Sequence, residues 1–232
     1  MLVSDLYTPA LLVDLGRLHA NLDAMQARAD AQDVALRPHV KTHKCAEIAR
    51  KQAERGASGI TCATVEEAEA FAAAGFEDIR LATPIVGPTK LERLAALSAS
   101  GTRISFSVDS AEGVRRAAAA FGAESQVAEV LIEVDTGYGR CGVPWDEPDG
   151  IADLAGTVHA TAGVRLVGLL SHGGDAYQPG QHGETTDEAR RRVMDAERDR
   201  VLDIAVGLVQ RGLLDTSAEL SVGSTPGVSV FT

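Results

Sequence analysis

Five basic side chains fall within eight residues, at positions 37–44 (RPHVKTHK). We expect a strand to end here, and alternation would place Arg37, His39, Lys41 and His43 on one face, where an anionic ligand must balance them. Crowded positive charge lowers the pKa of Lys41, which favours the neutral amine that attacks carbonyl carbon. A solvated basic strand end is the alternative. A zinc site at His39 and His43 is disfavoured, because no carboxylate or thiol accompanies them at ligand spacing.

Residues 221–227, SVGSTPG, form a second candidate site. The backbone amides of such a turn, together with the hydroxyls of Ser224 and Thr225, make a concave site that suits phosphate. Gly223 gives the turn its freedom. Barrel enzymes often bind phosphate after strands seven and eight, and this segment follows the last strand that we expect. An ordinary surface turn is the alternative interpretation.

Two further segments bring polar side chains to expected strand ends. In residues 133–143, EVDTGYGRCGV, a glycine-rich turn delivers Arg140, which could hold a phenolate or carboxylate by charge-assisted hydrogen bonds. In residues 168–177, GLLSHGGDAY, His172 stands at the rim, where its ring could stack on a flat ligand, and Tyr177 is a candidate hydrogen-bond donor. The alternatives are a turn with a surface arginine and a structural histidine.

Other conspicuous side chains receive no chemical role. His19, His159 and His182 lie in helix or loop contexts without partners. Trp145 is a packing residue or a wall of the substrate site. The charged residues in 186–200 are interpreted as the solvated face of a helix.

The elements that must position these side chains alternate between short β-rich runs and longer segments rich in Ala, Glu and Arg. This alternation indicates parallel strands joined by right-handed crossovers, and we favour an α/β barrel of the TIM type as one domain over residues 1–232. An eighth strand would come from residues 9–14, from residues 228–232, or from a longer polypeptide. We expect strands at residues 36–41, 59–63, 78–83, 103–109, 129–135, 164–171 and 219–224. We expect helices at residues 45–55, 65–74, 89–99, 111–121, about 150–158 and 186–210.

Composition excludes several classes of partner. The chain has 232 residues and a formal charge of −11, which would repel nucleic acid and anionic membranes. We find neither an apolar run long enough to span a bilayer nor a secretion signal. Three cysteines without a CxxC pair fit reduced thiols, and so a cytoplasmic location.

The four segments, in this order, resemble the D-threonine aldolase and D-serine dehydratase family, whose barrel is the alanine racemase N-terminal type of fold type III pyridoxal-phosphate enzymes. The match is specific in RPHVKTHK, EVDTGYGRCGV and GSTP, and looser in residues 8–25 and in SHGGDAY. The resemblance implies a pyridoxal 5'-phosphate cofactor held by Lys41 as a Schiff base. It implies further cofactor contacts from the following residues: His39, Arg140, His172, Tyr177, Gly223, Ser224 and Thr225. Arg37 belongs to the same motif, with a supporting role.

Family members continue into a last barrel strand and a C-terminal β-domain, and these 232 residues contain neither. The β-domain carries a metal site, so a divalent metal (Zn or Mn) is expected only in that missing segment, and no metal ligands are assigned here. The resemblance implies a lyase acting on small D-β-hydroxy amino acids, of either the aldolase or the dehydratase type, and a possible homodimer. Whether the chain acts alone stays open.

Three alternatives remain. An amino-acid racemase on the same barrel would need a second acid or base on the opposite face of the cofactor. A non-catalytic pyridoxal-phosphate carrier would fit a lone barrel. A metal-dependent or phosphosugar barrel would bind no pyridoxal phosphate, and the absence of a reducible Schiff base would reveal it.

Overall fold

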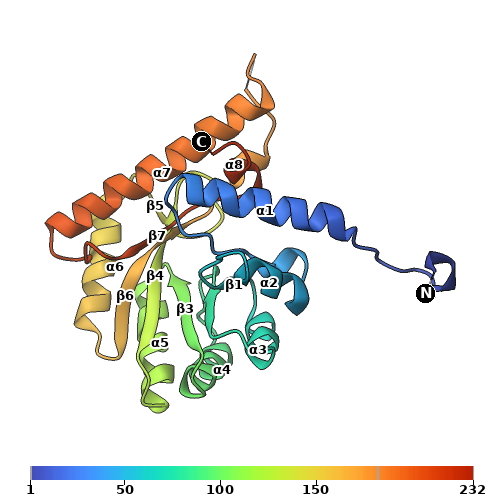
Figure 1. Ribbon diagram of the computed structural model, residues 1–232. Helices are drawn as coiled ribbons and strands as arrows, with labels where there is room; N and C mark the ends of the chain where they lie inside the picture. The colour runs from blue at the N-terminus through green and yellow to red at the C-terminus, as the bar shows by residue number, and fades with distance from the viewer. Residues whose placement is uncertain (1, 182, 232) are drawn as a thin grey trace.

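A curled parallel sheet is the central element of the computed structural model, which describes residues 2–181 and 183–231 (Figure 1). Hydrogen bonding orders the strands β1-β2-β3-β4-β6-β7, and the short β5 pairs with the end of β4. The strands are β1 (Ile60–Cys62), β2 (Asp78–Leu81), β3 (Arg103–Val108), β4 (Ala128–Asp135), β5 (Val143–Pro144), β6 (Val164–Ser171) and β7 (Glu219–Ser221).

Successive helices from α3 to α7 pack against one another around the outside of the sheet (Figure 1). The α-helices are α1 (Leu15–Ala31), α2 (Ala46–Ala53), α3 (Val65–Ala73), α4 (Pro88–Ala99), α5 (Ala111–Ala123), α6 (Pro148–Ala160), α7 (Thr186–Gln210) and α8 (Thr225–Val228). Three short 3-10 helices complete the fold, η1 (Val3–Asp5), η2 (Val40–Thr42) and η3 (Gly174–Tyr177). Within the described residues, no helix combines the length and the apolar character needed to cross a membrane.

Side-chain caps explain where several helices begin. The side chains of Thr64, Ser110 and Thr185 accept hydrogen bonds from the third backbone amide of α3, α5 and α7, which would otherwise lack an acceptor. Thr185 and Glu188 form a reciprocal capping box. Proline stands in the first turn of α4, α6 and α8, where its missing N–H costs nothing.

The two faces of the sheet differ in character. Side chains that pack under the helices are apolar, and this layer is the hydrophobic core. The registers align the polar residues Thr61, Arg80, Ser105 and Glu129 on the concave face. In the alternate row they align Cys62, Leu81, Phe106 and Val130, all of them buried in the core.

Ion pairs across the concave face show that the sheet curls. The guanidinium of Arg80 on β2 is fully buried and donates to both carboxylate oxygens of Glu219 on β7, at 2.5 and 2.8 Å. Three strands lie between β2 and β7 in the sheet order, so these side chains can meet only if the sheet bends round. Arg37 lies 2.7 Å from Asp78 and 3.7 Å from Glu219, at the same end of the interior. The predicted α/β barrel architecture is thereby confirmed as a curled, open barrel.

The prediction of a first strand at residues 36–41 is wrong from Val40 onward. Residues 36–41 contribute one isolated bridge, between His39 and Thr61, and the chain then turns into η2. Val40 is fully buried, and its carbonyl accepts hydrogen bonds from the amides of His43 and Lys44, which closes the turn. The other predicted strands are confirmed, with ends that differ by a few residues.

Neither candidate for an eighth strand forms one within the described residues. Residues 9–14 are extended but unpaired, and their apolar side chains are exposed, with Leu11 at 95%. Val228 ends α8, and Thr232 lies outside the described residues. The sheet therefore keeps two unclosed edges, at β1 and β7, in this part of the chain.

Candidate functional site

Lys41 and His39 stand together at the carboxyl end of the barrel opening. The backbone N–H of Lys41 donates to Nδ1 of His39 over 3.3 Å, which fixes the turn between them. Burial, followed by the charge of Arg140, lowers the pKa of Lys41, while Glu67 opposes this effect. Burial and the charge of Lys41 lower the pKa of His39 to about 4, so its imidazole is neutral near pH 7. Lys41 therefore loses its proton at a lower pH than an ordinary lysine does.

The second lysine of this segment is held differently. Lys44 has a φ of 49°, in the left-handed region, and its Nζ lies 3.1 Å from Oε1 of Glu67. Glu67 is 8% exposed, and its other oxygen accepts the N–H of Ala63 at 2.7 Å. Lys44 is therefore engaged in an ion pair with a buried carboxylate.

Two members of the predicted basic face lie elsewhere. Nδ1 of His43 accepts the N–H of Cys45 at 3.1 Å, which holds the ring at the start of α2, and burial lowers its pKa. The three-residue period of η2 breaks the strand alternation, which is why His43 leaves the face. The guanidinium of Arg37 pairs with Asp78 at the amino end of β2, far from the strand ends that carry the site.

The loop between β4 and β5 is shaped by backbone contacts. Oδ1 of Asp135 accepts the N–H groups of Gly137 and Gly139 at 2.9 and 3.0 Å. Gly142 has a φ of 105°, and a Cβ there would lie 2.7 Å from the backbone nitrogen of Asp135. The loop can therefore fold back on β4 only with glycine at this position, and it delivers Arg140 to the strand end.

The buried carboxylate of Glu133 contacts the guanidinium of Arg140. Glu133 is 2% exposed, and its Oε1 lies 3.4 Å from Nη2 of Arg140 and 3.1 Å from Sγ of Cys141. Sequence reasoning did not assign Glu133 a role. The sequence did offer one signal: Glu133 stands two residues before Asp135, so strand alternation puts both side chains on the concave face.

His172 links the loop of Arg140 to the last turn of the chain. Its Nδ1 donates to the carbonyl oxygen of Gly223 over 3.3 Å. Burial lowers its pKa, and the charges of Arg140 and Lys41 add to this effect. The ring of Tyr138 meets the imidazole edge-on, with centroids 6.0 Å apart. Tyr138 was missed from the sequence, although it stands inside the quoted glycine-rich segment.

Tyr177 lies at the outer rim of the same group. Its ring centroid is 6.4 Å from that of His172, and the residue is 60% exposed. This position fits a residue at the mouth of a site and leaves its hydroxyl accessible to a ligand.

The turn at residues 223–225 meets the requirements of an anion cradle. Gly223 has a φ of 132°, and the buried hydroxyl of Ser224 caps α8 by accepting the N–H of Gly227 at 3.3 Å. Pro226 has no N–H and the N–H of Gly227 is already accepted by Ser224, so within this turn the N–H groups of Ser224 and Thr225 are the ones left to bind a ligand. An amine, a guanidinium and an imidazole, from Lys41, Arg140 and His172, lie near this turn.

The remaining predicted residues have structural surroundings. The guanidinium of Arg200 lies 4.2 Å from the ring centroid of Trp145, which supports packing for Trp145. Nε2 of His159 lies 2.9 Å from the carbonyl oxygen of Leu213. His182 lies outside the described residues. Among the described residues, no three His, Cys, Asp or Glu side chains gather as a metal site.

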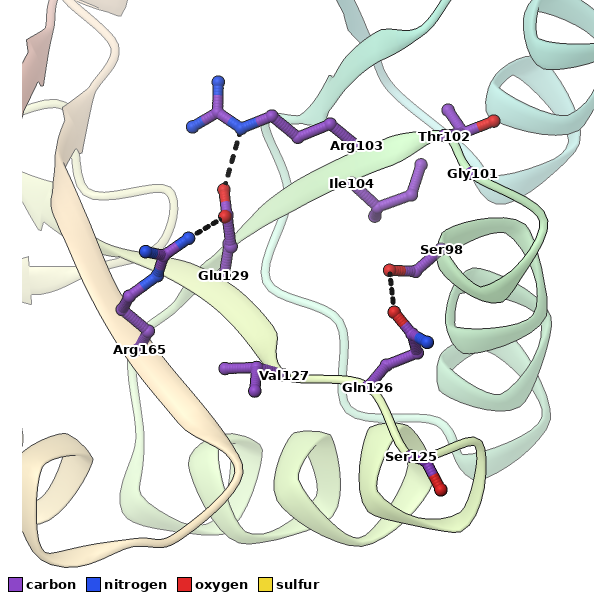
Figure 2. Close-up of a pocket in the computed structure, with 10 residues that line it drawn as sticks. All are labelled: Ser98, Gly101, Thr102, Arg103, Ile104, Ser125, Gln126, Val127, Glu129 and Arg165. Atoms are coloured by element: carbon purple, nitrogen blue, oxygen red, sulfur yellow. Dashed lines mark hydrogen bonds and ion pairs between the residues drawn. The ribbon is translucent and has the colours of Figure 1, made fainter.

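A cleft of about 410 Å³ opens at the opposite end of the sheet (Figure 2). It lies where β3 and β4 begin, and its guanidinium groups are already occupied. Glu129 accepts hydrogen bonds from both Arg103 and Arg165 across the cleft wall (Figure 2). The chemistry-bearing residues lie at the other ends of these strands, so this cleft is separate from the candidate site.

Comparison with known proteins decides the family. The family model for the alanine racemase N-terminal domain matches residues 13–230. The chain belongs to this family. The resemblance predicted from the four sequence segments is confirmed.

Within the alanine racemase N-terminal family, the chain is similar to aldolases and dehydratases. It is 44% identical to a D-threonine aldolase of Arthrobacter sp over 181 residues, 78% of this chain and 46% of the relative. It is 41% identical to the D-threo-3-hydroxyaspartate dehydratase of Delftia sp. (strain HT23) over 220 residues, 94% of this chain and 55% of the relative. A solved structure of this dehydratase superposes with a TM-score of 0.89 at 38% identity, over 97% of this chain and 57% of the other. The chain thus spans about half the length of the curated relatives it matches.

Proposed function

We propose that the chain carries the cofactor-binding barrel of a pyridoxal-phosphate-dependent lyase that acts on D-β-hydroxy amino acids. Lys41 would bind the cofactor's aldehyde as a Schiff base. The observation that carries the proposal is the convergence of an amine of lowered pKa with Arg140, His172 and the turn at Gly223. The names of the similar proteins, an aldolase and a dehydratase, support the same reaction class.

The residues present fit the cofactor. The amides and hydroxyls of Ser224 and Thr225, in the turn that begins at Gly223, would hold its phosphate, and Arg140 would hold its phenolate. His172 would lie against its ring, with His39 and Tyr177 at the border. When bound, pyridoxal phosphate draws electrons away from the α-carbon of the amino acid attached to it.

The chain's own side chains would have different roles in the reaction. Lys41 is the candidate base for the proton on the α-carbon, since its lowered pKa increases the fraction of neutral amine. His172 keeps its orientation by donating to Gly223, and Glu133 keeps Arg140 at the strand end. These contacts bind and orient, and they leave the choice between aldol cleavage and dehydration to groups that contact the β-hydroxyl.

We place three further features at the level of the whole protein. A divalent metal, Zn or Mn, would bind the β-hydroxyl from the part of the relatives that this chain does not span. The free cysteines Cys45, Cys62 and Cys141 fit a reducing cytoplasm. A homodimer with small D-amino acids as its substrates is expected by analogy with related barrels.

Covalent capture tests the proposal. The purified chain is mixed with pyridoxal 5'-phosphate, reduced with borohydride, digested and analysed by mass spectrometry. We expect a visible absorbance band that borohydride abolishes, and a phosphopyridoxyl group on the peptide containing Lys41. Absence of the band, or a label confined to other lysines, would overturn the assignment and favour a barrel without this cofactor.

A further inference from the structure

A buried carboxyl group lies directly beneath the candidate site. Glu197, on α7, is 2% exposed, and its Oε1 accepts the backbone N–H of Gly223 at 3.1 Å. Its Oε2 has no hydrogen-bond partner among the described residues. The expectation that the charged residues in 186–200 form a solvated helix face is therefore wrong at this position. Packing turns this part of α7 toward the strand ends.

Two hydrogen bonds hold the backbone of Gly223, one at its N–H and one at its carbonyl oxygen. Glu197 accepts from the N–H of Gly223, while the imidazole of His172 donates to the carbonyl oxygen of the same residue. Glu197 is thus the link between α7 and both strand-end segments of the site, because it also contacts the residue after His172. A Cβ at Gly173 would lie 2.4 Å from Oε2 of Glu197.

One turn before Glu197, α7 also contacts α8, the helix that follows the turn at residues 223–225. A Cβ at Gly227 would lie 3.2 Å from Sδ of Met194, so α8 packs closely on α7. The turn at residues 223–225 lies between these two contacts. Its backbone has to keep one conformation if its amides are to converge on a ligand.

We infer that Glu197 is the positioning residue of the phosphate cradle: it fixes the backbone of Gly223, and with it the turn that receives the phosphate. The inference rests on the proposed function and adds a residue on a different element. Burial raises the pKa of Glu197, while the hydrogen bond from Gly223 opposes this effect.

The test compares two ligands that differ only in the phosphate. Equilibrium dissociation constants are measured for pyridoxal 5'-phosphate and for pyridoxal, with wild type, Glu197→Ala and Glu197→Gln. We expect Glu197→Ala to weaken pyridoxal phosphate binding about 3- to 10-fold, the range for one lost hydrogen bond, and to leave pyridoxal binding unchanged. Glu197→Gln keeps an oxygen for the Gly223 N–H, so it should bind nearly as wild type does. Asp203→Asn, an exposed carboxylate on the same helix, is the matched control.

A second variant keeps the inference testable if Glu197→Ala fails to fold. Gly173 has φ −71°, which alanine adopts readily, so Gly173→Ala acts only through its clash with Glu197. We expect Gly173→Ala to weaken phosphate binding selectively, and to have no further effect when Glu197 is already alanine. Equal losses for both ligands, or no loss in either variant, would overturn the inference. Failure of wild type to bind either ligand would instead overturn the proposed function.

Discussion

The ammonium of Lys44 lies 3.1 Å from the carboxylate of Glu67, and this ion pair distinguishes the two lysines of the RPHVKTHK segment. Lys41, three residues earlier, borders the positive charge of Arg140, which lowers its pKa in addition to the effect of burial. Lys44 is therefore paired with a carboxylate, whereas Lys41 has a lowered pKa.

Replacing each lysine in turn should separate their roles. Lys41→Ala is expected to abolish borohydride-fixed cofactor while leaving the far-UV circular dichroism unchanged, because the side chain is not part of the hydrophobic core. Lys44→Ala should retain the fixed cofactor. A label that persists in the Lys41 variant and maps to Lys44 would reverse the assignment.

Removing the neighbouring cation should change the titration of Lys41. A nearby positive charge disfavours the ammonium, so Arg140→Ala should raise the pKa of Lys41 and reduce the neutral amine at a given pH. The pH profile of Lys41 labelling by an amine reagent, followed on its peptide by mass spectrometry, should move to higher pH. Arg140→Lys retains the charge and should leave the profile in place. Identical profiles in all three proteins would remove Arg140 as the cause.

The loop that carries Arg140 should depend on glycine at one position. Gly142→Ala forces a Cβ to within 2.7 Å of the Asp135 nitrogen at a φ of 105°, and should lower the free energy of unfolding by about 1–3 kcal/mol. Gly139 also has positive φ but faces open space, so Gly139→Ala should cost less. Urea denaturation measures both. If both variants lose the same free energy of unfolding, then the positive φ, and not the contact with β4, is the reason that glycine is needed at position 142.

The ion pair between Arg80 and Glu219 should contribute measurably to the free energy of unfolding. Glu219→Gln leaves the fully buried guanidinium of Arg80 without its carboxylate, and should lower the free energy of unfolding by about 2–3 kcal/mol. Glu112→Gln is the control, because its pairs with Arg115 and Arg116 are exposed and should contribute less than about 1 kcal/mol. Comparable losses in the two variants would mean that the buried pair contributes no more than a surface one.

The sequence predicted most of the strands because their apolar side chains alternate or run continuously between clear helix signals. It failed at residues 36–41, where the burial of Val40 and the two hydrogen bonds to its carbonyl override the strand pattern. A local pattern cannot show which carbonyl will accept two amides, since that depends on the neighbouring β1 and α2.

The grouping of the candidate residues could be predicted where each stands in a short, distinctive segment of the sequence. Lys41, Arg140, His172 and Gly223 each stand in a short, distinctive segment, and strand ends of a parallel sheet meet at one edge. Glu197 could not be found in this way. It is 26 residues from Gly223 in the chain, and its charged neighbours on α7 resemble a solvated face.

The placement of the apolar core outside the sheet has a consequence for how this scaffold tolerates change. The apolar core lies between the sheet and the helices, whereas Lys41, Arg140 and His172 lie in segments outside the strands. New reactivity can therefore be introduced at the strand tips without repacking the interior.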